Sequence, residues 1–257
     1  MKSFCLLLTL ALTVGAQVQP PRKKLLAVGV VKGFEHDSVS HALATIEKLG
    51  RQTGLWDTYI RTDTELLTKQ KLAAGNAKNL TYFDAVIFYT TGDLGLTDQQ
   101  KKDLLSFVHD DGKGFLGIHS ATDTYYDWPE YGEMIGAYFD QHPWGQGHCT
   151  LRTEDKNFAA TAHFPASFPF YDEIYQFKAP YSRDKLHVLM SVDPASVDLT
   201  NKNVHRTDKD FAVAWTHSYG KGRVFYSSLG HRDEVWDLPD IQKMWIEAVK
   251  WAMGMTQ

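Results

Sequence analysis

"GKGFLGIHSATDTYYDWPEYG", residues 112–132, gives the clearest indication of the fold class. Its apolar run, residues 115–118, stops abruptly at His119 and Ser120, and polar and aromatic residues follow. An unbroken apolar run of this length is typical of a strand buried in a parallel sheet. Ligands of open parallel sheets sit beyond the carboxyl ends of the strands, so His119 lies where chemistry is expected.

The segments before this stretch predict an α/β protein. The apolar stripe within residues 38–49 predicts a helix, and a second helix is expected from a Thr97 cap to Gly112. Read as a β-α-β-α-β-α-β alternation, this order predicts a parallel sheet with helices on both faces. The other predicted strands are residues 24–31, 56–63 and 83–91.

The second half of the chain is richer in strands. Residues 148–155 and 185–192 are strand-like, and residues 211–231 predict a hairpin that turns at Gly220-Lys221-Gly222. Residues 241–254 have the apolar spacing of a closing helix. No linker, repeat or low-complexity segment divides the chain, so we expect one domain, residues 17–257, with a β-rich C-terminal extension on the sheet.

The first 16 residues have the pattern of a secretory signal peptide. Lys2 supplies the positive charge, residues 4–14 are apolar, and small residues precede position 17. We therefore expect a secreted or periplasmic protein. The apolar run is too short to span a membrane, which takes about 20 residues. The net charge of −4 argues against nucleic-acid binding, because phosphate contacts need a basic surface.

Nucleophilic catalysis is poorly supported by the residues around the end of this strand. A nucleophile elbow needs Ser or Cys at the sharp turn, and Ser120 comes one residue late. Cys149 lies in a predicted strand with no feature that would lower its thiol pKa, so packing is expected. A His-Ser dyad stays open as an alternative.

Metal binding fits the histidines better. His36 and His119 follow predicted strands, His142 opens a loop soon after, and His231 ends the hairpin. Imidazole is the commonest metal ligand, and side chains from several strand ends can converge. No helical H-x-x-x-H motif is present, so hydrogen-bonded loop residues are the alternative interpretation.

Carboxylates and aromatic residues surround these histidines in the sequence. Asp123 and the Asp172-Glu173 pair are candidates for acid–base work, which burial could tune, although a solvated pair is equally compatible. Aromatic rings in the same loops could stack on a sugar, or form a satellite core. The candidate substrate-binding residues are Asp93, Tyr125, Trp128 and Trp144.

With these motifs the chain resembles the trehalose-utilisation (ThuA-like) family. The matching pieces run in order over residues 24–254 and include "GFEHDSV", "FDAVIFYTTGD", "GKGFLGIHSATDTYYDW", "IGAYFDQHP", "YDEIYQF" and "AWTHSYGKGRVFYSSLGH". The resemblance implies the flavodoxin-like fold of class I glutamine amidotransferases. His119 then occupies the strand end where those enzymes carry a nucleophilic Cys, so glutaminase activity is not expected.

The resemblance also implies a sugar substrate, such as a 3-keto-glycoside, and a divalent metal such as zinc at His36, His119 and His142. Elimination, isomerisation or hydrolysis would need a base, for which Asp123, Glu173 and His231 are the candidates, whereas the catalytic role of His119 would be to hold the metal or the carbonyl oxygen. A non-catalytic sugar-binding protein with the same pocket is the rival hypothesis. In either case the expected partner is a small carbohydrate, with neither nucleic acid nor, after signal cleavage, a membrane.

Overall fold

The fold is described from a computed structural model, which places residues 21–256. The predicted signal peptide, residues 1–16, lies outside these residues. A nine-stranded sheet forms the centre of the molecule, and its strand order is β2-β1-β3-β4-β11-β10-β9-β6-β7. No helix within residues 21–256 is long and apolar enough to cross a membrane.

The first five strands of this order are all parallel and reproduce the flavodoxin-like order 2-1-3-4-5. Their apolar side chains are buried because helices cover both faces of the sheet. The predicted α/β fold class is therefore confirmed. The strands are β1 (Lys23–Val28), β2 (Trp56–Arg61), β3 (Ala85–Phe88), β4 (Gly114–Ile118) and β11 (Gly222–Ser227).

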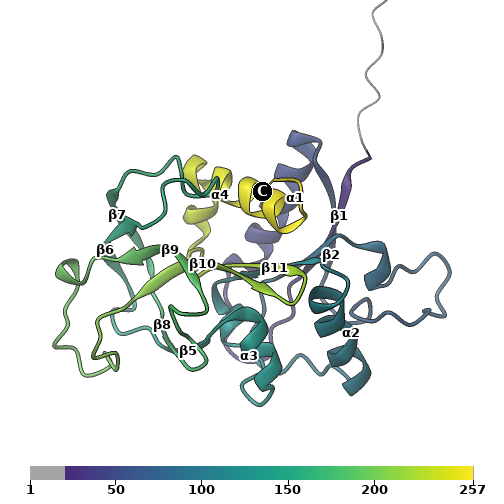
Figure 1. Ribbon diagram of the computed structural model, residues 1–257, viewed down its shortest axis with the longest axis horizontal. Coiled ribbons are helices and arrows are strands. Elements are labelled where there is room, and N and C mark those ends of the chain that lie inside the picture. The colour runs from purple at the N-terminus through teal and green to yellow at the C-terminus, as the bar shows by residue number, and fades with distance from the viewer. Residues whose placement is uncertain (1–20, 257) are drawn as a thin grey trace, which may run out of the picture.

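Two helices lie on each face of the sheet (Figure 1). The pair α1 and α4 encloses one apolar core, and the pair α2 and α3 encloses the other. The Thr97 side chain caps α2 as predicted, in a capping box with Gln100. The helices are α1 (Ser38–Thr53), α2 (Asp98–His109), α3 (Pro129–Ile135) and α4 (Pro239–Ala252).

One part of the predicted alternation is wrong. No α-helix connects β2 to β3, because residues 62–84 form loops and a single 3-10 turn, Leu80–Tyr82. The apolar residues of this segment are interrupted by polar residues, by Gly75 and by two Asn residues. They therefore form no apolar stripe that a helix could bury.

The β-rich extension continues the sheet beyond β11 with antiparallel strands (Figure 1). The predicted hairpin is present as β10 and β11, and β11 also pairs in parallel with β4. A separate two-stranded sheet, β5 with β8, lies beside it. The remaining strands are β5 (Tyr138–Gln141), β6 (Gln146–Thr153), β7 (Ser167–Glu173), β8 (Gln176–Lys178), β9 (His187–Val192) and β10 (Ala212–Tyr219).

Candidate functional site

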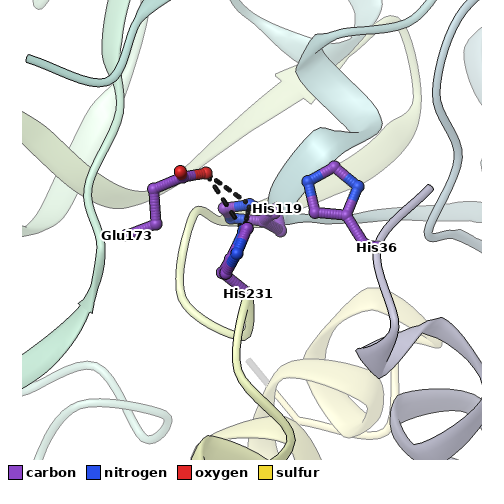
Figure 2. Close-up of side chains that lie close together, drawn as sticks. All are labelled: His36, His119, Glu173 and His231. Atoms are coloured by element: carbon purple, nitrogen blue, oxygen red, sulfur yellow. Dashed lines mark hydrogen bonds and ion pairs between the residues drawn. The ribbon is translucent and has the colours of Figure 1, made fainter. Parts of the chain in front are cut away.

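Four polar side chains meet at the carboxyl edge of the parallel strands (Figure 2). His36 follows β1, His119 follows β4, and His231 follows β11. Glu173 is the last residue of β7, at the far end of the strand order. Any two of these residues can bring a ligand atom within 4.8 Å of each other, although 137 positions separate Glu173 from His36 in sequence.

His119 is held rigidly at the turn that ends β4. Its backbone φ is +43°, a left-handed conformation that costs a non-glycine residue about 1–2 kcal/mol. Its carbonyl oxygen accepts a hydrogen bond from the Tyr226 hydroxyl at 2.6 Å. Its Nδ1 lies 2.6 Å from the Ser228 carbonyl oxygen, which can only accept, so Nδ1 carries the proton. Nε2 therefore points into the cluster and is the ring nitrogen available to a ligand.

Glu173 connects two of the histidines. Its Oε2 lies 3.4 Å from Nε2 of His119 and 3.1 Å from Nδ1 of His231. The two ring nitrogens are themselves 3.2 Å apart. The His36 ring completes the group, with its centroid 4.8 Å from that of His119 and 5.1 Å from that of His231.

The surroundings of these groups shift their pKa values in different directions. Burial alone would raise the pKa of Glu173, but hydrogen bonds with His119 and His231 outweigh burial and hold this pKa well below its usual range. Burial opposes a charge on His231, yet the contact with Glu173 raises its pKa overall. Burial, followed by the neighbouring histidines, lowers the pKa of His36 to about 3. His36 is therefore neutral, and Glu173 is ionised.

Hydrogen bonds to the Asp172 side chain hold the loop that carries His231 in place. This carboxylate is fully buried and accepts backbone N–H bonds from Gly230 at 2.6 Å and from Arg232 at 3.3 Å. Because successive side chains of a strand point to opposite sides, β7 directs Asp172 toward this loop and Glu173 toward the histidines. The sequence pair Asp172-Glu173 thus supplies one positioning group and one group of the site.

The cluster has the composition and dimensions of a metal site. With zinc–nitrogen bonds of about 2.0–2.1 Å, tetrahedral ligands lie roughly 3.4 Å apart, close to the spacing within the Glu173, His119 and His231 triangle. His36 makes no side-chain hydrogen bond within residues 21–256, and its buried Nδ1 has no partner there. Figure 2 shows a His36 ring nitrogen turned toward His119. The four residues could therefore hold a divalent metal.

Two predicted site residues lie at the border of this group. His142 is 45% exposed, and its Nδ1 is 3.8 Å from Oε1 of Glu173, so it stands behind the carboxylate rather than among the four converging residues. Asp123 accepts a hydrogen bond from the Tyr126 hydroxyl at 2.6 Å. Burial raises the Asp123 pKa, and the opposing influences of Tyr126, His119 and His142 are smaller.

The predicted substrate-binding residues are not gathered around the four-residue cluster. Tyr125 and Trp128 are only 4% and 6% exposed and pack in the core between α2, α3 and the sheet, which leaves no free ring face for a sugar. The Trp144 indole donates to the Asp198 carbonyl oxygen at 2.9 Å. Asp93 is exposed and accepts a hydrogen bond from the Gly95 backbone N–H at 2.8 Å.

Two residues beside the cluster were not singled out from the sequence. Nε2 of Gln146 lies 2.9 Å from Nε2 of His231, on the side of the ring away from Glu173. Phe34 lies against His36, with ring centroids 4.7 Å apart. An aromatic residue two positions from a candidate ligand was a usable signal for Phe34, whereas nothing local in the sequence marks Gln146.

Fold and site together define a class of protein: a flavodoxin-like α/β protein with a buried histidine–carboxylate centre at the carboxyl edge of its sheet. Cys149, the one cysteine within residues 21–256, is buried in β6 and its pKa is raised by burial to about 12, so it supplies no thiolate. The chain belongs to the ThuA family, whose sequence model, described as trehalose utilisation, matches residues 24–252.

Solved structures show the same fold. A ThuA-like protein from Bacteroides uniformis ATCC 8492 is 22% identical, with a TM-score of 0.74, and the match covers 93% of this chain and 94% of that one. A ThuA-like protein from Parabacteroides merdae ATCC 43184 is 16% identical, with a TM-score of 0.70 and 91% of each chain covered. A β-galactosidase from Bacillus circulans sp. alkalophilus is 12% identical, with a TM-score of 0.53, over 89% of this chain and 31% of that one. No curated protein matches the sequence significantly.

Proposed function

We propose that this protein is a metal-assisted, carbohydrate-active enzyme that acts on 3-keto-glycosides or closely related sugars. The observation that carries the proposal is the convergence of His36, His119, Glu173 and His231 within 4.8 Å at the carboxyl edge of the sheet. Membership of a family described as trehalose utilisation supports a sugar as the substrate. The residue directly after β4 is His119, and Ser120, one position later, is fully buried and accepts a hydrogen bond from Thr91, which argues against an acyl-enzyme mechanism.

In this proposal the four clustered residues hold a divalent metal such as zinc. A bound divalent ion supplies Lewis acidity, which polarises a carbonyl or activates water. The hydrogen bond from His119 Nδ1 to the Ser228 carbonyl fixes the ring orientation and keeps Nε2 free. Glu173 contributes the negative charge, and its lowered pKa keeps it ionised at any physiological pH.

Asp123 is the group we assign to proton transfer. A 3-keto group acidifies the hydrogen on the neighbouring C2 carbon, so elimination or isomerisation begins when a base removes that hydrogen. The two carboxyl groups differ in the direction of their pKa shifts: that of Glu173 is lowered and that of Asp123 is raised. Such divergence separates a permanently ionised group from one that can take up and release a proton. The Tyr126 hydroxyl, which donates to Asp123, would orient it.

We also propose that the enzyme acts outside the cytoplasm, in the periplasm or the medium. The support is the signal-peptide pattern of residues 1–16, which lie outside the described part of the chain. A location in the periplasm or the medium agrees with a small carbohydrate as the substrate.

The decisive experiment measures metal content and turnover in the same samples. Purified protein is incubated with 3-keto-trehalose, with and without chelator, and products are followed by NMR. We expect about one metal per chain, turnover that chelator abolishes and zinc restores, and loss of at least about 100-fold in kcat for Asp123→Asn with metal content unchanged. Full turnover by metal-free protein would overturn the metal assignment. Sugar affinity without turnover would favour a binding protein.

A further inference from the structure

A cavity of about 440 Å³ opens directly beside the histidine cluster. His36 and His231 form part of its wall, so a molecule in the cavity reaches the candidate metal centre without passing through the protein. The volume falls in the range of about 300–1,000 Å³ that is usual for small-molecule sites. His36 is only 7% exposed, so its ring separates the cavity from the interior of the cluster.

Phe34 supplies an aromatic face at the mouth of this cavity. Its side chain is 62% exposed, the most exposed large apolar residue among residues 21–256. Its ring centroid is 4.7 Å from that of His36 and 6.3 Å from that of His231, and it is tilted by only 31° to the His231 ring. Leaving an aromatic ring in water next to a polar cluster has no folding benefit, whereas a sugar ring can pack on such a face.

The rest of the cavity wall is polar and acidic. Glu35, Asp37 and Asp233 have no ion-pair partner within residues 21–256. Arg232, the one cationic side chain in the wall apart from the histidines, is paired with Glu234 at 3.0 Å. In the metal-free protein the cavity therefore presents an excess of about three negative charges to a ligand.

We propose that this cavity is a subsite for an uncharged sugar ring that stacks on Phe34, and that its carboxylates exclude anionic sugars such as sugar phosphates and uronic acids. The inference rests on the proposed function for the reaction itself, but it adds a substrate class and two recognition elements. Carboxylates that carry no counter-charge repel a phosphate, whereas they do not repel an uncharged sugar.

The size of the charge effect follows from Coulomb's law. A phosphate dianion roughly 8 Å from three carboxylates is disfavoured by about fifty-fold in affinity at 10 mM salt. At physiological ionic strength, where the Debye length is about 8 Å, the penalty falls to about sevenfold. A purely steric exclusion would not depend on salt, so the salt dependence identifies the mechanism. Loss of the Phe34 ring should weaken binding of an uncharged sugar roughly three- to tenfold.

The test uses the full, chelator-treated protein, so that no metal adds positive charge beside the cavity, with trehalose and trehalose 6-phosphate as binding probes measured by calorimetry or ligand-observed NMR. Phe34→Ala should weaken trehalose binding three- to tenfold without loss of stability, because the ring is exposed. Tyr82→Ala is the matched control, since Tyr82 is also exposed but precedes β3, at the opposite edge of the sheet. The control should bind trehalose like the parent protein.

The triple variant Glu35→Gln, Asp37→Asn, Asp233→Asn tests the charge filter. We expect it to bind trehalose as before, and to bind trehalose 6-phosphate better than the parent by a factor that shrinks as salt is added. Unchanged trehalose binding in Phe34→Ala, or unchanged phosphate discrimination in the triple variant, overturns the inference even if the enzyme turns over 3-keto-trehalose. Conversely, trehalose binding that depends on Phe34 in a protein without turnover supports the subsite and refutes the proposed reaction.

Discussion

The stability of the metal-free protein should depend on pH through His36. Burial, together with the neighbouring histidines, lowers the His36 pKa from 6.5 to about 3. The folded protein therefore resists protonation of this ring, whereas the unfolded chain takes up the proton near pH 6.5. The contribution of neutral His36 to stability is fully present above pH 6.5, and it is lost as the pH falls from 6.5 toward 3.

The size of the effect follows from these two pKa values. Between pH 7.5 and pH 5.5, a shift from 6.5 to about 3 removes about 1.4 kcal/mol from the free energy of unfolding. His36→Gln has no ring to protonate and should lack this loss. With a urea m-value of roughly 3 kcal/mol per M, the parent midpoint should fall by about 0.5 M more than the variant midpoint.

The assay is urea unfolding of chelator-treated protein at both pH values. His231, whose pKa is raised, contributes with the opposite sign in this window, but it is present in both proteins and cancels in their difference. His148→Gln, which removes an exposed histidine, should keep the parent's fall in midpoint. Equal falls in the parent protein and His36→Gln would refute the reasoning, because His36 would then be protonated as readily in the folded state.

Four further outcomes are expected. Glu173→Gln should abolish stoichiometric zinc binding in a competition assay with a chromophoric chelator, since it removes the only anionic ligand. Asp172→Asn should weaken zinc binding by about 10–100-fold while leaving all four ligands in place, because the His231 loop loses its anchor; unchanged affinity would remove Asp172 from the site. Cys149 should resist iodoacetamide in native protein at pH 8, and Cys149→Ser should keep turnover within a few-fold; rapid alkylation would contradict its raised pKa. Mass spectrometry of exported protein should find residues 1–16 missing, and an intact Met1 would exclude signal cleavage.

The parallel half of the fold was predictable because unbroken apolar runs mark buried strands. The runs at residues 24–31, 83–91 and 115–118 each overlap an observed strand, β1, β3 and β4 respectively. Strand β7 was not predicted, because its sequence "SFPFYDE" contains Pro169 and follows a loop-like segment. Its position becomes clear only through pairing with β6, a long-range contact that no local pattern encodes.

The sequence allowed most residues of the site to be predicted, but not how their side chains are placed relative to one another. His36 follows β1 and His119 follows β4, which only β3 separates in the strand order, so the topology places both at the same edge of the sheet. Glu173 and His231 were candidates for a base, and the structure brings them into the cluster. His142 follows β5, which pairs with β8 outside the main sheet, and this explains why it lies at the border. Exposure of Phe34 depends on the packing of its neighbours, which a single sequence does not specify.

The position of β11 has a consequence for synthesis of the protein. This strand lies in the middle of the sheet, between β4 and β10, yet it is the last strand that the ribosome produces. Until residues 222–231 have been translated, β4 and β10 are open edges, and His231 cannot join the cluster. A nascent or truncated chain therefore exposes strand edges with unpaired backbone groups, which favour aggregation, and it lacks one of the four clustered groups. A metal that needs all four groups can therefore be bound only after the chain has been synthesised beyond His231.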